Sequence, residues 1–365
     1  MKNRSREENI MRQWSIAKKS KKIRNLRPKR NRLFTITPIL VFLCIFTTVT
    51  IIPTLIVIPT KSDEQLKPAK EEIEIKSKQD SQSDAITVSV MRKQTNDIED
   101  IPLETYVSYV VASEMPAEFE LEALKAQSLT ARTYIVTQML HNKSEADVTD
   151  TTSDQVYQNE TELRKRWGDT YHEKMSKIHK AVQATKGEIL TYNETPIFPA
   201  YFSTSNGYTE NSEDYWENKL PYLRSVKSPW DKESPKFLDQ KTLSIQEVSQ
   251  LLNIPLQPGT TIPIELTRTK SERVKNLKIG DQTLTGRDVR ERLDLRSNDF
   301  TVTQKGDYLI FKTKGYGHGV GMSQYGANGM AKEGKTYDEI VKYYYKDVEI
   351  SLIDETAPTL LTKNN

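Results

Sequence analysis

Cysteine is almost absent from this sequence: Cys44 is the only one among 365 residues. It lies in a long apolar segment, so the rest of the chain has no thiol that could form a disulfide or act as a nucleophile. The folded part must therefore be stabilised by packing alone, and its roughly 275 residues are enough to bury a core. The sequence also lacks an internal repeat, and the pattern of its segments indicates a mixed α+β fold.

Acidic residues are scarce at the N-terminus. Residues 1–32 contain thirteen Lys and Arg but only two acids, Glu7 and Glu8. Because the whole chain carries +3, the remainder is net acidic, and the two parts suit different environments. Residues 33–60 carry no charge at all, and their apolar centre, at about 36–58, is long enough to cross a hydrocarbon layer of ~30 Å.

These features predict an uncleaved transmembrane helix at 33–60, with residues 1–32 as a basic cytoplasmic tail and the body exported. The alternative is a cleaved signal peptide, but the apolar run is too long and no small-residue cleavage site follows it. A nucleic-acid-binding tail is another alternative. Basic flanks are the ordinary means of orienting a span, so no nucleic-acid partner is expected. Residues 61–84 are charged and aperiodic, which predicts a flexible stalk.

A folded body is expected from 85 to 350, with a β-rich subdomain at 243–314 and a tail at 351–365. Apolar periodicity and capping boxes mark the helices, and alternation marks the strands. The expected helices cover residues 103–114, 118–140, 160–186, 244–252 and 336–345. The expected strands cover residues 86–92, 188–192, 197–204 and several segments within 262–314. Residues 205–240 are rich in Ser, Asn, Pro and Trp, which indicates an ordered loop region.

Glu114 is the leading candidate for a catalytic group. It ends an apolar, helix-like run, and Pro116 biases Met115 away from the helical region, so the helix should stop there. Apolar neighbours disfavour ionisation and favour a carboxyl that can donate a proton near neutral pH. The alternative is a surface glutamate, which the negative end of a helix would repel.

Two cations, Lys125 and Arg132, lie two turns apart on the following predicted helix and therefore share one of its faces. One interpretation is the wall of a groove that binds carboxylate or hydroxyl groups of an anionic or hydroxyl-rich polymer. Their spacing agrees equally well with a solvated flank whose aliphatic stems cover apolar surface.

Two further segments carry polar side chains next to tight backbone. Residues 200–207, AYFSTSNG, end a strand with hydroxyls, and Tyr201, Ser203 and Ser205 could bind sugar hydroxyls; a polar turn is the alternative. Residues 315–327, GYGHGVGMSQYGA, contain five glycines around His318, followed by Gln324. No Lys-Ser/Thr follows to suggest nucleotide binding, and a lone histidine is poor evidence for a metal. We expect a rigid loop that lines the groove of Glu114.

Three segments together resemble the SpoIID/LytB family. SEMPAEFELEALKAQSLTARTY, AYFSTSNGYTENSEDYW and GYGHGVGMSQYGANGMAKEGKTYDEIVKYYY look like its first, middle and C-terminal signatures, in the right order. The resemblance covers about residues 86–350 and implies that Glu114 is the catalytic acid. The groove residues that it implies are Lys125, Arg132, Tyr201, Ser203, Ser205, His318 and Gln324.

The activity implied by the resemblance is lytic transglycosylation of peptidoglycan, which cleaves MurNAc–GlcNAc bonds and leaves 1,6-anhydro-MurNAc ends. One carboxyl suffices because the sugar's own C6 hydroxyl replaces water, whereas ordinary glycosidases use two. Some family members look like zinc proteins with His and Cys ligands. Without a cysteine in the body of this chain, no metal or other cofactor is expected.

The resemblance also implies a setting. It places the protein in the mother-cell membrane facing the septal wall, where it would degrade that wall during engulfment in a spore-forming cell. The implied partners are a peptidoglycan amidase and a polytopic membrane protein. LytB-type relatives leave open a non-catalytic wall-binding module that activates an N-acetylmuramoyl-L-alanine amidase, for which Glu114 need not act as an acid. The three groove motifs argue against a third alternative, a purely structural scaffold.

Overall fold

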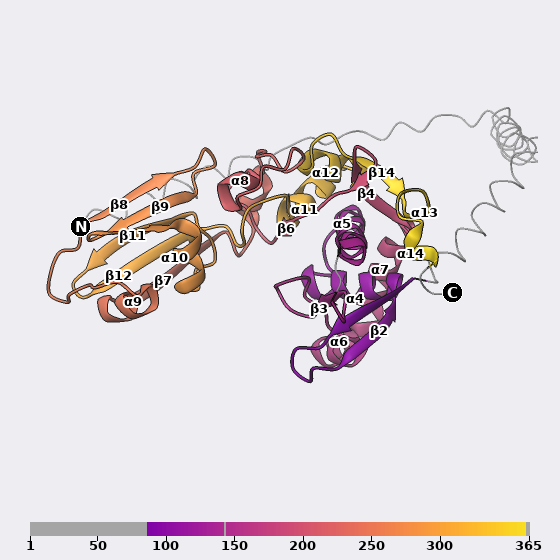
Figure 1. Ribbon diagram of the computed structural model, residues 1–365, viewed down its shortest axis with the longest axis horizontal. Helices are drawn as coiled ribbons and strands as arrows, with labels where there is room; N and C mark the ends of the chain where they lie inside the picture. The colour runs from indigo at the N-terminus through magenta and orange to yellow at the C-terminus, as the bar shows by residue number, and fades with distance from the viewer. Residues whose placement is uncertain (1–85, 142–143, 363–365) are drawn as a thin grey trace, which may run out of the picture. The chain divides into compact units, whose positions relative to one another are not determined.

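The computed structural model describes residues 86–141 and 144–362 as a mixed α+β fold (Figure 1). The predicted cytoplasmic tail, transmembrane helix and stalk lie outside these residues. Among the helices of the described ranges, none combines the length and the apolar character needed to cross a membrane.

A helical region surrounds one central helix, α5, on which α4, α7, α11, α12 and strand β4 pack (Figure 1). Its helices are α4 (Leu103–Glu114), α5 (Leu121–His141), α6 (Glu160–Trp167), η2 (Gly168–Thr170), α7 (Tyr171–Ala184), α8 (Ser212–Tyr215), η3 (Pro229–Glu233), α11 (Gln324–Lys332), α12 (Tyr337–Tyr344), α13 (Ile353–Thr356) and α14 (Thr359–Thr362). Its strands are β1 (Thr87–Met91), β2 (Ile98–Pro102), β3 (Val148–Thr149), β4 (Glu188–Tyr192), β5 (Thr195–Pro196), β6 (Tyr201–Phe202), β13 (Met322–Ser323) and β14 (Glu349–Leu352). They form small sheets in the orders β2-β1-β3, β14-β4-β5 and β13-β6.

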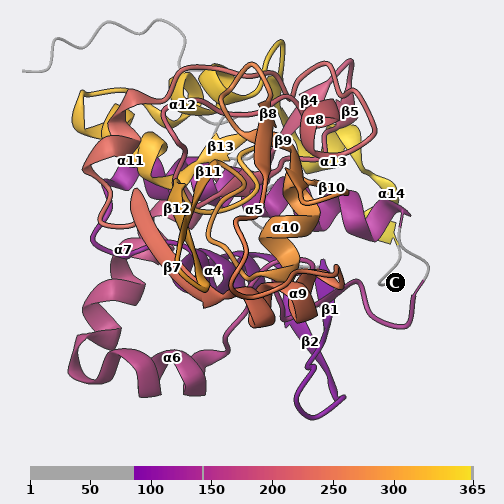
Figure 2. The ribbon, with the colours of Figure 1, turned by 90° about the vertical axis from the view of Figure 1, so that its left-hand side faces the viewer.

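A second region contains two three-stranded antiparallel sheets, in the orders β11-β12-β7 and β10-β9-β8. It has a core of its own, which includes Leu243, Leu277 and Phe311. Figure 2 faces this region and shows α10 beside β9 and β10. Its elements are β7 (Leu238–Ser244), α9 (Ile245–Leu252), β8 (Ile264–Arg268), β9 (Val274–Ile279), β10 (Gln282–Thr285), α10 (Gly286–Arg292), β11 (Phe300–Lys305) and β12 (Tyr308–Lys314).

Helix α5 is buried on every side rather than along one stripe. Every residue from Ala126 to Val136 is buried, polar ones included. The hydroxyls of Ser128, Thr130 and Thr133 each donate to the backbone carbonyl four residues earlier, at 2.7 Å. Such local bonds satisfy buried hydroxyls without a partner from another element, which is why a helix rich in Ser and Thr can occupy the centre of a core.

Arg132 is fully buried and is the charged centre of this region. Its Nε and Nη2 donate to both carboxylate oxygens of Glu104 on α4, at 2.9 and 2.6 Å. Nη1 and Nη2 also donate to the carbonyls of Glu188 (3.2 Å) and Val182 (3.3 Å). This side chain therefore joins α4, α5, the end of α7 and the start of β4. The predicted groove wall is wrong for Arg132, because a helix without an exposed face cannot present it to a ligand.

Several boundaries differ from the sequence-based expectation. The helix expected from 118 begins at Leu121, because residues 116–119 form a turn closed by a bond from Phe119 N to the Pro116 carbonyl (3.1 Å). Gly168, with φ of +51°, ends α6 and divides the helix expected over 160–186. The strand expected over 197–204 is only the two residues of β6. The chain also stays folded past residue 350, since Leu360 is buried in the helical core.

Other local expectations are confirmed. Helix α4 ends at Glu114, and Met115 is extended before the proline. The capping box that opens α9 is present: the Glu247 amide donates to Ser244 Oγ (3.1 Å), and the Ser244 amide donates to the Glu247 carboxylate (2.7 Å). These features depend on neighbouring residues only, so the sequence contains all the information that they need.

Replacing Arg132 by Met should lower the free energy of unfolding by about 3–5 kcal/mol, because it leaves the Glu104 carboxylate buried without its counterion. Urea denaturation followed by circular dichroism measures the loss. The control is Lys335→Met, which removes one partner of the exposed Lys335–Glu339 pair, since exposed pairs contribute little. Equal losses in the two variants would contradict the assigned role of Arg132.

Candidate functional site

Glu114 lies in a groove of about 720 Å³. The groove is lined by segments far apart in the sequence, including the end of α4, the loop of residues 150–158, β6 and α10. The lining residues that carry polar or aromatic groups include Glu114, Ser153, Asp154, Tyr201, Ser203, Tyr215, Trp216, Lys236, Arg287, Arg290, Tyr316, His318 and Gln324.

Within the described residues, every group that hydrogen-bonds to the Glu114 carboxyl is a donor. The Val156 amide donates to Oε1 at 2.8 Å, and the side chains of Tyr201 and Gln324 also hydrogen-bond to the carboxyl. Burial raises the pKa of Glu114, and these three bonds oppose it without cancelling it. The group therefore holds its proton to higher pH than an exposed glutamate does.

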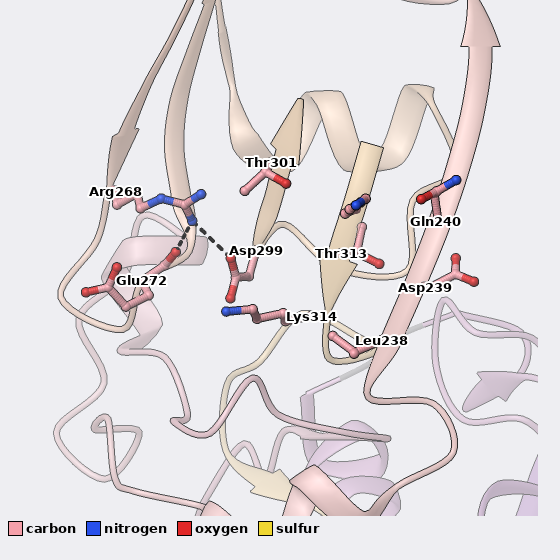
Figure 3. Close-up of a pocket in the computed structure, with 10 residues that line it drawn as sticks. Leu238, Asp239, Gln240, Arg268, Glu272, Asp299, Thr301, Thr313 and Lys314 are labelled. Carbon is pink, nitrogen blue, oxygen red and sulfur yellow. Dashed lines mark hydrogen bonds and ion pairs between the residues drawn. The ribbon is translucent and has the colours of Figure 1, made fainter. Parts of the chain in front are cut away.

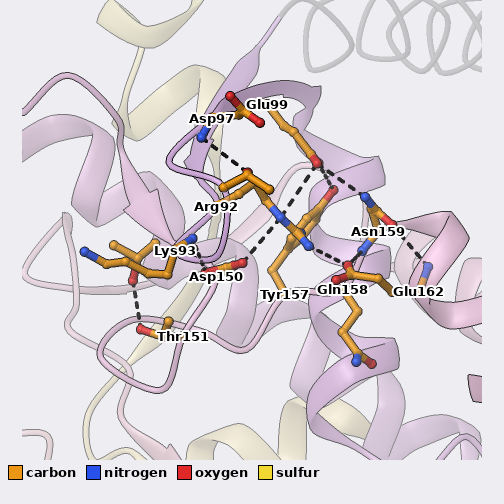
Figure 4. A network of polar contacts seen from close by, with 12 residues as sticks. Arg92, Lys93, Asp97, Glu99, Asp150, Thr151, Tyr157, Gln158, Asn159 and Glu162 are labelled. Atoms are coloured by element: carbon orange, nitrogen blue, oxygen red, sulfur yellow. Dashed lines mark hydrogen bonds and ion pairs between the residues drawn. The ribbon is translucent and has the colours of Figure 1, made fainter.

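The loop of residues 150–158 is held at both ends by Arg92, as Figure 4 shows. The guanidinium lies 3.3 Å from Asp150 at the start of the loop and 2.6 Å from Glu162, which follows its end. It also stacks over the ring of Tyr157, 5.1 Å from the centroid. Because Val156 lies between these anchors, Arg92 sets the position of the amide that binds Glu114.

Glycines let the 315–321 segment pack flat on the strand that carries Tyr201. A Cβ atom on Gly317 would lie 2.7 Å from the Cβ of Phe202, and one on Gly321 would lie 1.9 Å from the carbonyl of Ala200. This close approach allows β13 to pair in parallel with β6, with Met322 opposite Tyr201. The rigid loop expected beside Glu114 is present, and Gly317 and His318 line the groove.

His318 is neutral and has both ring nitrogens occupied. Nδ1 accepts from the Val320 amide at 3.0 Å, and the ring also hydrogen-bonds to the backbone of Tyr201. Burial, followed by the positive charge of Arg290, lowers the pKa of His318 to about 3. The rings of Phe202, Tyr215 and Trp216 surround it at 5.3–5.7 Å between centroids. His318 is therefore an aromatic support of the groove rather than a proton donor.

The structure separates the predicted groove residues into two groups. Tyr201, Ser203, His318 and Gln324 line the groove with Glu114. Ser205 does not: it is fully buried, and its Oγ donates to Asp231 at 2.8 Å.

Neither predicted cation belongs to the groove wall. The Lys125 ammonium lies 2.6 Å from Glu122 and over the ring of Tyr337. Arg132 is buried against Glu104. A cationic wall exists, but Lys236, Arg287 and Arg290 form it. The sequence-based prediction missed these three because no local pattern reports that α10, which carries Arg287 and Arg290, or the segment before β7, which carries Lys236, reaches the groove.

A second hollow, of about 780 Å³, lies against β7, β11 and β12 (Figure 3). Its central acid, Asp299, accepts from Arg268 and Asn206 at 2.9 Å each, so it is not available for proton transfer. In the described residues, no group of three or more His, Cys, Asp or Glu side chains is arranged to hold a metal ion. The groove of Glu114 is therefore the better candidate for a catalytic site.

Replacing His318 by Asn should remove part of the acid sensitivity of the fold. Between pH 6.5 and about 3 the unfolded chain binds a proton at His318 that the folded chain does not, so stability falls as pH falls through this window. Each pKa unit corresponds to ~1.4 kcal/mol. Asn keeps an acceptor for the Val320 amide but does not titrate.

Urea midpoints of both proteins between pH 7 and pH 4 measure this difference. His172→Asn, at an exposed histidine on α7, controls for the substitution itself. A His318→Asn variant with the slope of the wild type would contradict the buried neutral state.

Comparison with known proteins agrees with these observations. The chain matches the SpoIID family, Stage II sporulation protein, over residues 91–192. It is 47% identical over 317 residues to Stage II sporulation protein D of Bacillus subtilis (strain 168), covering 83% of this chain and 92% of that protein. The Bacillus amyloliquefaciens protein of that name is 48% identical over 283 residues, covering 76% and 82%. The Amidase enhancer of Bacillus subtilis (strain 168) is 31% identical over 290 residues, covering 65% of this chain and 39% of that protein. The chain therefore belongs to the SpoIID family of stage II sporulation proteins.

Proposed function

We propose that the protein is a lytic transglycosylase that cleaves MurNAc–GlcNAc bonds of peptidoglycan glycan strands. The observation that carries the proposal is the Glu114 carboxyl, which lies in a groove with a raised pKa and with only donors around it. A general acid has to be protonated near the working pH and within reach of the leaving oxygen.

In the proposed reaction, Glu114 gives its proton to the glycosidic oxygen, and the bond from that oxygen to C1 of MurNAc breaks. The C6 hydroxyl of the same sugar then attacks C1 and closes a 1,6-anhydro ring. Its proton returns to the Glu114 carboxylate, so the enzyme is regenerated without water. The Val156 amide (2.8 Å) and the Tyr201 and Gln324 side chains stabilise the carboxylate that exists between the two transfers.

A second carboxylate in the groove does not suit the role of base. Oδ1 of Asp154 accepts from the Tyr134 hydroxyl (3.0 Å). Its Oδ2 accepts from the Thr149 amide and hydroxyl, both at 2.8 Å. These bonds tie Asp154 to α5 and to β3. The remaining carboxylate of the groove, Glu291, is paired with Arg287 at 2.9 Å. A single working carboxyl favours the intramolecular route over two-carboxylate hydrolysis.

The cationic wall suits a substrate that carries carboxylates. The Lys236 ammonium lies over the rings of Tyr316 and Tyr325, and within the described residues no acid forms an ion pair with it. MurNAc has a free lactyl carboxylate once its stem peptide is removed. We assign Lys236, with Arg287 and Arg290, to that carboxylate in place of Lys125 and Arg132.

The setting is part of the proposal. The body would act outside the cytoplasmic membrane, held by the span predicted at 33–60, on the septal wall during engulfment. Its proposed partners are a peptidoglycan amidase, which would supply peptide-free strands, and a polytopic membrane protein.

Replacing Glu114 by Gln tests the acid directly, because Gln keeps the shape and removes the proton. The full chain is incubated with peptide-free glycan strands, and the products are analysed by mass spectrometry. Anhydro-MurNAc ends should form with the wild type and fall by ~100- to 10,000-fold in the variant. Glu120→Gln, an exposed change six residues later in the chain, should retain activity. Undiminished anhydro products from Glu114→Gln would rule out the mechanism.

Replacing Lys236 by Met should raise KM for peptide-free strands about three- to fivefold with little change in kcat, since a partly exposed ion pair contributes up to ~1 kcal/mol. The control is Lys232→Met, at an exposed lysine on η3 that does not line the groove. Initial rates over a range of strand concentrations separate the two constants. An unchanged KM would remove Lys236 from the binding site.

The second candidate is a non-catalytic module that binds glycan strands and activates an amidase. It is favoured by the relative whose name is Amidase enhancer. Strand binding and amidase stimulation by both the wild type and Glu114→Gln, without anhydro products from either, would support it over the enzyme.

A further inference from the structure

Gln155 lies next to the groove but does not line it. Its side chain is fully buried in the loop of residues 150–158. Oε1 accepts from the Tyr106 hydroxyl at 3.1 Å, and Nε2 donates to the Tyr201 hydroxyl at 3.2 Å. Tyr201 in turn hydrogen-bonds to Glu114. A buried chain of hydrogen bonds therefore runs from α4, through this loop and β6, back to the end of α4.

The Tyr106 hydroxyl sets the direction of the hydrogens in this chain, because the Gln155 amide oxygen is the acceptor that the described residues offer it. Tyr106 is fully buried and has one hydroxyl hydrogen, which it gives to the amide oxygen of Gln155. Because the Gln155 oxygen faces Tyr106, the Gln155 NH₂ group faces Tyr201. This NH₂ donates to a lone pair of the Tyr201 hydroxyl oxygen. Tyr201 then has its own hydrogen left for Glu114.

This direction decides where the proton of Glu114 can point. Val156 N–H, Tyr201 O–H and the Gln324 amide all act as donors toward the carboxyl. None of them accepts a proton from it. The acid hydrogen of Glu114 therefore points into the open groove, where the leaving oxygen of a bound glycan would lie.

We propose that Gln155 is a positioning residue that makes Tyr201 a donor to Glu114 and thereby directs the acid proton of Glu114 toward the substrate. This inference rests on the proposed transglycosylase function and names the device that orients its acid. Gln155 touches neither substrate nor reacting atoms, so its effect passes entirely through Tyr201.

Other ionisable groups near the carboxyl do not obscure this effect. Burial holds the pKa values of Tyr106 and Tyr201 well above the ordinary value, so both keep their hydrogens through the neutral range. The neighbours on other elements are Tyr134 on α5, whose pKa burial also raises, and Asp154, whose oxygens accept from Tyr134 and Thr149. The positive charges of the groove wall are Lys236, Arg287 and Arg290. Glu291 and His318 are the other ionisable residues that line the groove.

The decisive variant is Gln155→Glu, which keeps size and shape but replaces the donor by an acceptor. Its carboxylate takes the hydrogens of both tyrosines, so Tyr201 turns its lone pair toward Glu114. The acid then donates to Tyr201 instead of to the glycan. We expect kcat to fall on the order of 10- to 100-fold, a part of the acid/base contribution, with KM unchanged.

A second readout separates this role from a general loosening of the fold. Because the Glu114 carboxylate loses one donor, its pKa rises, and the alkaline limb of the kcat–pH profile moves to higher pH. Tyr201→Phe should give the same shift, and adding Gln155→Glu to it should cause no further loss. Gln282→Glu, an exposed change on β10, should alter neither kcat nor the profile.

Titration of Glu114 by NMR with ¹³C-labelled glutamate, with its signal assigned by its loss in Glu114→Gln, tests the inference without any turnover. An upward shift in Gln155→Glu and in Tyr201→Phe supports it, even if the wild type makes no anhydro products and the proposed function fails. An unshifted Glu114 titration in both variants overturns it. Additive losses in the double variant overturn it as well, and Tyr201→Phe keeps the test valid if Gln155→Glu does not fold.

Discussion

The ion pair between Arg132 and Glu104 is the interaction on which the rest of the helical region depends. A charge pair this completely removed from water is tolerated when its remaining donors also have partners. Here the carbonyls of Val182 and Glu188 accept from the Arg132 guanidinium. The pair fixes α4 on the central helix. Because Glu114 lies at the other end of α4, the same contact determines where its carboxyl enters the groove.

Around Glu114 the proposed acid and the cations of the groove come from different parts of the fold. The carboxyl, its donors and the aromatic ring of His318 come from the helical region and the glycine-rich loop. Two of the three cations of the groove, Arg287 and Arg290, come from α10, which packs on a separate sheet with its own core. Keeping the cations on another element lets the carboxyl retain its proton, because a guanidinium in contact would favour the ionised form.

Much of this could be predicted from local sequence. The end of α4 before Pro116, the capping boxes and the glycine-rich loop depend on adjacent residues and agree with the structure, as does the family resemblance. The assignment of Arg132 failed because it assumed an exposed face on α5, and burial on all sides is set by tertiary packing rather than by helical periodicity. The assignment of Lys125 failed because its ammonium is paired with Glu122. Gln155 gave no signal either, since its role depends on two tyrosines at a sequence separation of 49 and 46 residues.

The start of α5 is joined to α11, which carries the groove residue Gln324, and to α12 by contacts of very long sequence separation. The Glu120 amide binds Asn328 across 208 residues, and Glu122 accepts from the Tyr337 amide across 215. Contacts of this span carry a high loop-closure entropy and form slowly. They also require a complete chain: a polypeptide that is still being synthesised has Glu114 but not yet α11 or α12. The Glu114 carboxyl thus exists well before the groove around it is complete, so an unfinished chain has no site for the proposed reaction.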